Sequence, residues 1–200
     1  MQTLIIATRN RGKLREIKEL LKDLPLKVVS LADYPDMPPI VEDGKTFRAN
    51  ALKKAFTISR KTKMLVLGED SGLEVEALGW RPGIFSARFS GEQADDEKNN
   101  QKLLEELKAV DPKRRRARYR CVAALTDGER FIATVSGSCE GSIAREPRGK
   151  NGFGYDPLFL VPEYNKTFGE LPPEVKERLS HRGKAMKKVK KFLKRYLGSV

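Results

Sequence analysis

The chain has 200 residues, which suits one domain, or one domain of two lobes, with a buried core. Its 39% hydrophobic and 34% charged residues predict a soluble globular protein. The lack of a signal-like N-terminus and of a bilayer-length apolar run argues against a membrane partner and favours the cytoplasm. The formal net charge of +13 predicts attraction to polyanions, which could be nucleic acid, an acidic membrane surface or a small phosphorylated substrate.

The first half of the chain alternates short apolar runs with helical patterns. In chain order we expect a strand over residues 3–7, a polar loop over 8–13, a helix through Leu14, Ile17 and Leu21, a strand over 26–31, a proline-rich loop over 34–44 and a helix over 46–61. Next we expect a strand over 64–67, a turn, a second strand over 71–78, a loop over 80–91 and a helix over 95–109. This alternation favours an α/β fold.

The second half is richer in strand patterns. Two long runs flank Asp127-Gly128, a dipeptide preferred in tight hairpin turns, and another apolar strand covers residues 157–161. A helix that begins near Ser180 closes the chain. Because no repeat or long linker is present, we expect a single domain over residues 1–200.

Two cysteines, Cys121 and Cys139, lie in separate strand-like segments. They lack CxxC spacing, and the chain has only one histidine to help form a metal site. Since soluble proteins usually keep such thiols reduced, we expect both to be reduced core residues.

The loop TRNRGK, residues 8–13, stands between a strand and a helix. Exposed N–H groups and the helix dipole favour an anion at such a place, and Lys13 adds a positive charge. It is not a Walker A loop, because Leu14 stands where Ser or Thr should hold magnesium. Phosphate binding and an ordinary polar loop both remain open.

An acid pair, Glu69 and Asp70, follows the apolar run over 64–67. At the end of a strand in an open α/β sheet these acids would face the usual ligand crevice, and Glu42 could add a third carboxylate. Magnesium takes one or two carboxylates and completes its shell with phosphates and water. The alternative is a solvated turn in which Asp70 caps local N–H groups.

The loop GKNGFGYDP, residues 149–157, combines glycines with two aromatic residues and an acid. Such a loop could approach a ligand closely, stack on a base and accept a base N–H through Asp156. It could equally be a glycine-rich turn whose Phe153 and Tyr155 pack into the core.

The segment SHRGKA, residues 180–185, places cationic groups at the start of a helix. Ser180 is a suitable N-cap, but His181 and Arg182 lie at the wrong end of the helix dipole for positive charge. An anionic or electron-rich ligand would explain them, and a surface accident is the alternative.

Together, TRNRGK, VEDG at 41–44, EDSGLEVEALGWRPGIFSARFSG at 69–91, GFGYDP at 152–157 and SHRGKA resemble the motifs of the inosine triphosphate pyrophosphatase family. The resemblance runs nearly end to end and in the family's order. It implies hydrolysis of XTP, ITP and dITP to the monophosphate and pyrophosphate with Mg2+, which clears deaminated purines from the nucleotide pool. It also implies a homodimer and an elongated mixed central sheet with flanking helices, with two lobes around a substrate cleft.

The resemblance also assigns roles to individual residues. Glu42 and Asp70 would attend the metal, and Asp70 would be the proton acceptor. The substrate-binding residues would be Thr8, Arg9, Asn10, Arg11, Gly12, Lys13 and Lys54 at the triphosphate, Ser71 and Lys176 as further contacts, and Phe153, Gly154, Tyr155, Asp156, His181 and Arg182 at the base. His181 and Arg182 would donate to the 6-oxo group. Arg9 stands where the family often has glycine, and Glu69 replaces a frequent aspartate, with no role assigned.

There are two alternatives, of which only the second belongs to a different class of protein. Maf-type nucleotide pyrophosphatases share the general fold but handle other nucleotides, and GFGYDP and SHRGKA argue against them. A basic nucleic-acid-binding protein would account for the net charge and for the basic runs at 113–120 and in the last helix. That helix interleaves its lysines with an apolar stripe, which favours a solvated face and no specific nucleic-acid partner.

Overall fold

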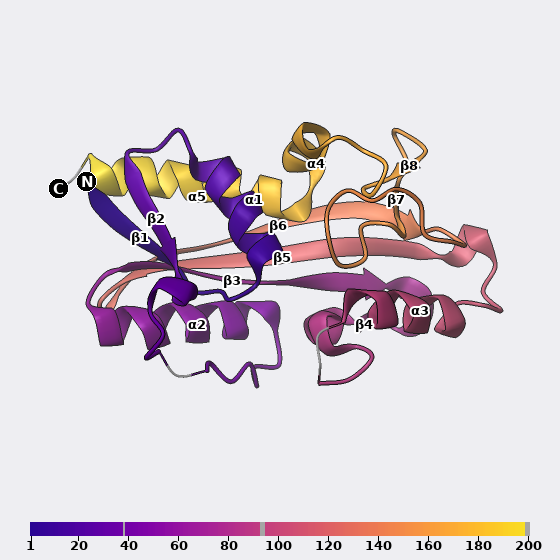
Figure 1. The fold of residues 1–200 in the computed structure, drawn as a ribbon, viewed down its shortest axis with the longest axis horizontal. Helices are drawn as coiled ribbons and strands as arrows, with labels where there is room; N and C mark the ends of the chain where they lie inside the picture. The colour runs from indigo at the N-terminus through magenta and orange to yellow at the C-terminus, as the bar shows by residue number, and fades with distance from the viewer. Residues whose placement is uncertain (38, 93–94, 199–200) are drawn as a thin grey trace. The chain divides into compact units, whose positions relative to one another are not determined.

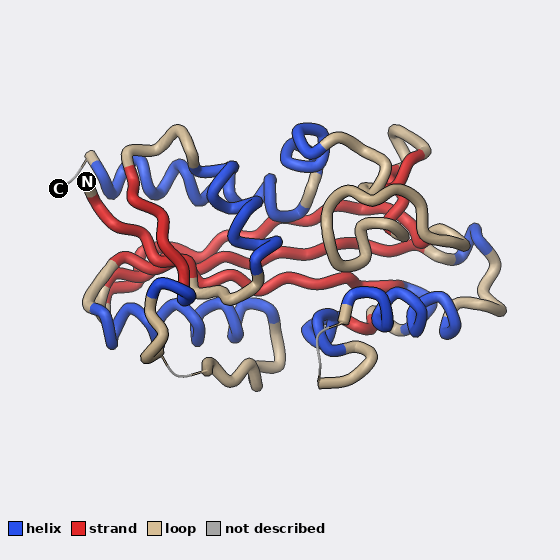
Figure 2. The backbone as a smooth tube through the Cα atoms, in the orientation of Figure 1, coloured by secondary structure: helices blue, strands red, loops and turns tan. Residues whose placement is uncertain are grey.

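The computed structural model describes residues 1–37, 39–92 and 95–198, and Figures 1 and 2 show the path of the chain. Within this part the α-helices are α1 (Arg11–Leu21), α2 (Phe47–Thr62), α3 (Asp96–Glu106), α4 (Pro173–Leu179) and α5 (His181–Leu197). The strands are β1 (Gln2–Ile6), β2 (Leu26–Ser30), β3 (Leu65–Val75), β4 (Arg81–Pro82), β5 (Arg116–Asp127), β6 (Arg130–Ile143), β7 (Phe159–Val161) and β8 (Lys166–Thr167).

The strands form a mixed sheet, which confirms the expected α/β class with flanking helices. Its order is β2-β1-β3-β5-β6-β7-β8, and β4 pairs with β3. β1 is parallel to β2 and β3, whereas β3–β4, β6–β7 and β7–β8 are antiparallel pairs. Ile6 lies opposite Leu67, so the loop that follows the carboxyl end of β1 begins beside the acid pair, which lies inside the longer strand β3. Ligands usually bind beyond the carboxyl ends of parallel strands.

The chain divides into two compact units. The first comprises residues 1–70, 121–137 and 182–200, and the second comprises residues 71–120 and 138–181. The boundaries fall inside β3, β5 and β6 and directly after the first residue of α5.

In the first unit, helices cover both faces of the strands. Figure 1 shows α1 and α5 on one side and α2 on the other. The core follows the strand alternation, because Leu4 and Ile6 of β1 pack with α1 and α5 while Ile5 packs with Ile58 of α2. β3 behaves likewise and directs Leu67 away from the α2 face. Successive side chains along this part of β3 therefore point to opposite faces of the sheet.

The second unit has its own core, which is rich in aromatic rings. The Tyr119 and Phe159 ring centroids lie 4.6 Å apart, and Phe159 stacks on Phe168 at 5.3 Å. Leu103 of α3 and Leu158 before β7 are fully buried in the same cluster. The loop over 149–156 contributes Tyr155 to this core.

The expected turn between two strands at Gly68 is wrong, since β3 is one strand of 11 residues from Leu65 to Val75. Glu69 and Asp70 lie in its middle and are 2% and 4% exposed. Two adjacent acids resemble a turn in sequence, but here opposite charges from other elements stabilise them inside a strand. The alternative of a solvated turn capped by Asp70 is therefore also wrong.

Other expected elements agree with the structure or need small corrections. The hairpin expected around Asp127-Gly128 is confirmed, but its two turn residues are Gly128 and Glu129, with Gly128 in the left-handed region at φ +57°. The expected loop over 80–91 contains β4 and a short 3-10 helix, and α4 and β8 were not expected. Ser180 is the C-cap of α4 and directly precedes α5. Pro38, in the expected proline-rich loop, lies outside the described residues.

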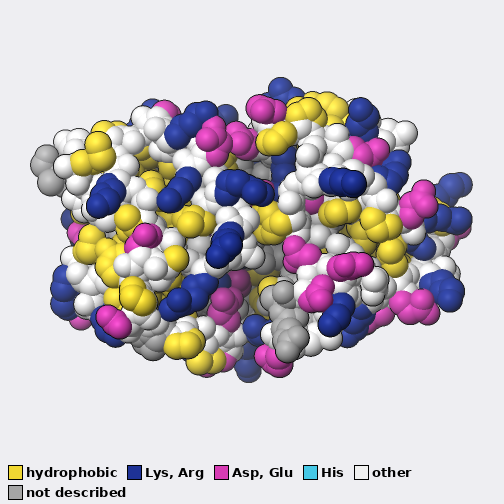
Figure 3. All heavy atoms as spheres, in the orientation of Figure 1, with side chains coloured by type: hydrophobic (Ala, Val, Ile, Leu, Met, Phe, Trp, Pro, Cys, Tyr) yellow, Lys and Arg dark blue, Asp and Glu magenta, His cyan; other side chains and the backbone are white. Residues whose placement is uncertain are grey.

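The surface charge is mixed. Figure 3 shows Lys and Arg side chains spread over one face with Asp and Glu among them. In the basic run at 113–120, Arg118 and Arg120 both pair with Glu74. The buried Arg115 donates to the Leu107 carbonyl at 2.7 Å. Part of this run therefore forms ion pairs and hydrogen bonds within the protein.

The described helices are all too short or too polar to serve as membrane spans.

Candidate functional site

The loop after β1 is shaped by its own side chains. The Thr8 hydroxyl accepts from the Asn10 N–H at 3.1 Å, and Asn10 caps α1 by accepting from the Lys13 N–H at 2.9 Å. The first turn of α1 carries no acid. The positive end of the helix dipole therefore has no acidic side chain in that turn, an arrangement that suits an anion. Arg9 points elsewhere and donates to the Met37 carbonyl at 2.9 Å.

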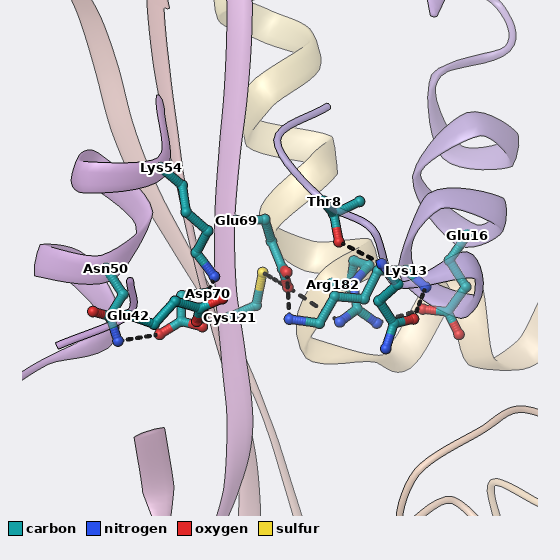
Figure 4. Close-up of polar contacts among 11 residues, drawn as sticks. Thr8, Lys13, Glu16, Glu42, Asn50, Lys54, Glu69, Asp70, Cys121 and Arg182 are labelled. Atoms are coloured by element: carbon teal, nitrogen blue, oxygen red, sulfur yellow. Dashed lines mark hydrogen bonds and ion pairs between the residues drawn. The ribbon is translucent and has the colours of Figure 1, made fainter. Parts of the chain in front are cut away.

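Glu69 links this loop to the start of α5. Its Oε2 lies 2.8 Å from Lys13 Nζ, and its Oε1 accepts from Arg182 Nη2 at 3.1 Å and from Cys121 Sγ at 3.3 Å. Arg182 also forms an ion pair with Glu16 of α1 (Figure 4). The anions that stabilise Arg182 at the wrong end of a helix dipole are thus carboxylates of the protein itself, and the interpretation as a surface accident is wrong.

The second acid of the pair faces the opposite way. Adjacent residues in a strand point to opposite faces, and Figure 4 shows Glu69 and Asp70 on the two sides of β3. Asp70 Oδ2 accepts from Asn50 Nδ2 at 3.1 Å, and Asp70 Oδ1 accepts from Lys54 Nζ at 3.1 Å. Asn50 and Lys54 are one turn apart on α2 and so share a face. The strand therefore separates the two acids into two polar clusters.

Glu42 joins Asp70 through a shared cation. Lys54 Nζ donates to Glu42 Oε2 at 2.8 Å as well as to Asp70. Asn50 also fixes the loop that carries Glu42, because its Oδ1 accepts from the Gly44 N–H at 2.8 Å. The Asn50 amide is thus oriented at both ends, with its oxygen toward Gly44 and its nitrogen toward Asp70. Two carboxylates consequently converge on one ammonium group.

Close packing of α2 on β3 brings these groups together. A Cβ on Gly68 would lie well inside van der Waals contact of the Ala51 carbonyl oxygen and the Ala55 nitrogen. The α2 backbone therefore approaches β3 more closely than any side chain at position 68 would allow. That approach places Asn50 and Lys54 within hydrogen-bond reach of Asp70.

The charges shift the pKa values in different directions. Burial raises the pKa of Asp70 and outweighs the opposing effect of Lys54. Burial also acts to raise the pKa of Glu69, but Lys13 and Arg182 hold that pKa well below its usual range. The pKa of Glu42 is lowered, because Lys54 and Lys13 overcome its burial. Asp70 is thus the more basic carboxylate, which suits a proton acceptor.

The donor set at Asp70 fits a hard divalent cation. Magnesium in a nucleotide site takes one or two carboxylates together with substrate phosphates and water. Glu42 and Asp70 supply two carboxylates that already share the Lys54 ammonium group. In the described residues, no group of three or more His, Cys, Asp and Glu side chains could hold a metal by itself. A cation here would therefore need oxygen ligands from a bound substrate.

Apart from Arg182, the predicted base-binding residues lie in the second unit. In the loop over 149–156, the Phe153 N–H donates to Asp156 Oδ2 at 2.8 Å. Lys176 of α4 forms an ion pair with Asp156, and its Nζ lies 4.8 Å from the centroid of the Phe153 ring. Both charged groups are buried. Asp156 therefore organises the loop from inside, while Phe153 is only half-buried.

Tyr155 and His181 extend the aromatic core. Tyr155 is buried, and its hydroxyl donates to the Ser86 carbonyl at 2.8 Å. The imidazole of His181 stacks on Tyr119, with 4.5 Å between ring centroids and 13° between the planes. We expected that both aromatic residues of the loop could pack into the core, but only Tyr155 is buried there, and Phe153 is half-buried.

The predicted site residues thus form two groups. Thr8, Arg9, Asn10, Arg11, Gly12, Lys13, Glu42, Lys54, Asp70 and Arg182 lie in the first unit, and Ser71, Phe153, Gly154, Tyr155, Asp156, Lys176 and His181 lie in the second. Peptide bonds join the groups at Asp70-Ser71 and His181-Arg182. Within the first group, contacts connect Lys54 with both proposed metal ligands, and Glu69 connects Lys13 with Arg182. Arg9 and Arg11 are exposed and outside these contacts.

Sequence reasoning missed several partners of these residues. The sequence motifs do not single out Asn50, although its spacing of four from Lys54 places both on one face of a helix. Glu16 and Cys121 were not predicted as neighbours of Arg182 and Glu69, because they come from distant parts of the chain. Their contacts depend on tertiary packing.

Comparisons with known proteins show the family. The model of the Ham1 family matches residues 4–192, so the chain belongs to this family, and the resemblance seen in its motifs is confirmed. A dITP/XTP pyrophosphatase of Desulforamulus reducens is 52% identical over 192 residues, 96% of each chain. One of Geobacter sulfurreducens is 51% identical over 195 residues, 96% of this chain and 97% of the relative.

Solved structures agree. A HAM1 protein from Coxiella burnetii has a TM-score of 0.87 at 43% identity, covering 98% of this chain and 100% of that one. A nucleoside-triphosphatase / dITP/XTP pyrophosphatase from Mycobacterium abscessus has a TM-score of 0.76 at 40% identity, covering 94% and 98%. The fold of this chain is therefore that of solved Ham1 proteins.

Proposed function

We propose that this chain is a nucleoside triphosphate pyrophosphatase that hydrolyses dITP, XTP and ITP to the monophosphate and pyrophosphate. The observation that carries the proposal is the convergence of Glu42 and Asp70 on Lys54, beside a loop and helix N-terminus suited to phosphate. Relatives that are 48–52% identical to this chain are named dITP/XTP pyrophosphatases, which supports dITP and XTP as substrates. In the cell, this reaction would remove deaminated purines from the nucleotide pool.

In the proposed mechanism, cationic groups bind the triphosphate. Lys13 and Lys54, with the N–H groups at the start of α1, would neutralise its charge. Glu42 and Asp70 would hold Mg2+, which when bound neutralises charge on the phosphates and on the departing pyrophosphate. Ser71, the next residue in the sequence after Asp70, would also contact the substrate.

Asp70 would act on the water. Asn50 holds one of its oxygens while Lys54 binds the other, which fixes the direction of the carboxylate. Asp70 would orient a water and accept its proton as the water oxygen attacks the α-phosphorus. The bond between the α-phosphorus and the bridging oxygen breaks, and pyrophosphate leaves with the bonding electrons.

Residues of the second group, together with Arg182 of the first, would recognise the base. Phe153 would offer its ring for stacking, with the loop shaped by Asp156 and Lys176. His181 and Arg182 would donate to the 6-oxo group, and an adenine amino group would leave those donors unpaired. Ion pairs with Glu16 and Glu69 hold the Arg182 guanidinium in a fixed position.

Two wider proposals concern assembly and location, and only the first rests on the resemblance. The chain would act as a homodimer, which size-exclusion chromatography with light scattering would test. It would work in the cytoplasm, which fractionation would test.

A substrate panel tests the activity itself. The protein would be incubated with dITP, XTP, ITP, ATP and dGTP in the presence of magnesium, and pyrophosphate and orthophosphate would be measured separately. We expect pyrophosphate from the first three and a catalytic efficiency roughly tenfold or more lower on ATP. Release of orthophosphate, or equal efficiency on ATP and ITP, would contradict the proposal.

A further inference from the structure

Helix α3 holds the backbone of Gly154, in the middle of the glycine-rich loop of the second unit. The Gly154 N–H donates to Asp96 Oδ2 at 2.7 Å, and its carbonyl oxygen accepts from Asn100 Nδ2 at 3.0 Å. Asp96 and Asn100 are four positions apart and therefore share one face of the helix. Two side chains of one helix thus bind both backbone polar groups of a single loop residue.

The two hydrogen bonds restrict the backbone conformation of Gly154. Its φ of +62° lies in the left-handed region. Glycine adopts this region readily, but it also adopts several other backbone conformations. A glycine-rich loop without external bonds would sample many of them at an entropic cost on ordering. Fixing both the donor and the acceptor of Gly154 selects one conformation before any ligand arrives.

The neighbours of Gly154 pass this constraint on to the base-binding groups. On one side, Phe153 has its N–H on Asp156 and its ring beside the Lys176 ammonium. On the other side, the Tyr155 hydroxyl is bonded to the Ser86 carbonyl. The direction of the half-buried Phe153 ring therefore depends on how α3 holds the next residue.

We propose that Asp96 and Asn100 are positioning residues for nucleobase recognition. They set the Gly154 backbone, and through it the Phe153 ring, in the conformation that receives the purine. The inference rests on the proposed function, because that function assigns the loop to the base. Neither residue takes part in the chemical step, so their loss should affect binding of the base and leave binding of the phosphates unchanged.

Helix α3 supplies a matched control for each residue. Asn99 is also buried, but it accepts from the Ser90 N–H at 2.7 Å and donates to the Ala87 carbonyl at 3.1 Å, in a different loop. Glu97 is exposed in the same first turn as Asp96. Asp96→Ala and Glu97→Ala remove the same charge from the same end of the helix, and only the former removes a bond to Gly154.

The experiment compares Asp96→Ala, Asn100→Ala, Glu97→Ala and Asn99→Ala in the full-length protein. KM and kcat are measured for ITP and ATP, with inhibition constants for IMP and for inorganic tripolyphosphate. For Asp96→Ala and Asn100→Ala we expect KM for ITP and the inhibition constant of IMP to rise roughly threefold or more, as for loss of one hydrogen bond. The preference for ITP over ATP should fall, while the tripolyphosphate constant stays within error of wild type.

The exposed position of Asp96 keeps the test decisive if Asn100→Ala does not fold, because Asp96→Ala removes little buried contact. The inference is overturned if Asp96→Ala matches Glu97→Ala, or if tripolyphosphate inhibition changes as much as IMP inhibition. A wild-type protein that releases no pyrophosphate from ITP would instead overturn the proposed function. An active wild type with unaffected variants would overturn only the role of α3.

Discussion

The carboxylate of Glu69 accepts a hydrogen bond from the guanidinium of Arg182 at 3.1 Å, although the two residues lie 113 positions apart and both are buried. Removing one partner of a buried pair leaves the other charge without compensation. We expect Glu69→Gln to lower the free energy of unfolding by about 3–5 kcal/mol, measured by urea denaturation. Glu19→Gln, which breaks an exposed pair with Lys22, is the control and should change it by less than about 0.5 kcal/mol. Equal effects of the two changes would contradict the prediction.

The contribution of Glu69 to stability should depend on pH. Its pKa is held well below the ordinary value of 4.5, because Lys13 and Arg182 outweigh its burial. A carboxylate with a lowered pKa stabilises the fold above its unfolded pKa, and the stabilisation is lost as pH falls through the folded pKa. The difference in Tm between wild type and Glu69→Gln should therefore be constant above about pH 5 and shrink on acidification below 4.5. Calorimetry without divalent metal measures it, and a difference that grows in acid would refute it.

Asp70→Asn should remove activity without unfolding the protein. The amide cannot accept the proton of the attacking water, so we expect kcat on ITP to fall roughly 100- to 10,000-fold. Asp43→Asn is the control, because Asp43 is exposed and pairs with Lys53 at 2.6 Å. It should keep wild-type turnover. An Asp70→Asn protein with undiminished kcat would exclude Asp70 as the base.

Gly68→Ala should separate α2 from β3. The added methyl group would collide with backbone atoms of Ala51 and Ala55, which cannot rotate away as a flexible side chain could. We expect a loss of about 1–3 kcal/mol in stability and a marked fall in activity, since Asn50 and Lys54 would move away from Asp70. Urea denaturation and the ITP assay report the two effects. Gly198→Ala, whose added methyl group would lie 3.4 Å from the Lys194 carbonyl oxygen, should change neither.

Removal of divalent cations should stop pyrophosphate release, and magnesium should restore it. Glu42→Gln removes one of the two carboxylates that fit the cation. We therefore expect the variant to need a higher magnesium concentration for half-maximal activity, measured by titrating the metal at fixed ITP. Full activity in excess chelator would contradict the metal assignment.

The two thiols should be unreactive in the folded protein. Both cysteines are free and buried, as expected for reduced core residues. Burial raises the pKa of Cys121 well above its ordinary range, and the Glu69 carboxylate raises it further. At pH 8 we expect no reaction with Ellman's reagent before denaturation and reaction of both thiols in guanidinium chloride. Rapid labelling of the native protein would show that this part of the core opens.

Part of the site could be predicted from the sequence because its signals are local. Asn10 and Lys13 lie in one loop and the first helical turn, and Phe153 to Asp156 lie in one loop. The turn predicted at Gly68 failed because glycine followed by acids is also a turn signal. The actual reason for this glycine is the approach of a helix, which no local pattern shows.

Taken by itself, the sequence determined the α/β class, the position of most helices and strands, and the order of motifs that identifies the family. These features follow from local hydrophobic periods and from residue types at short spacing. Only the tertiary structure decided what the acid pair does. Because adjacent strand residues face opposite ways, Asp70 meets Lys54 and Asn50, while Glu69 meets Lys13 and Arg182 from α1 and α5. That division depends on which helix covers each face of β3, and long-range packing determines it.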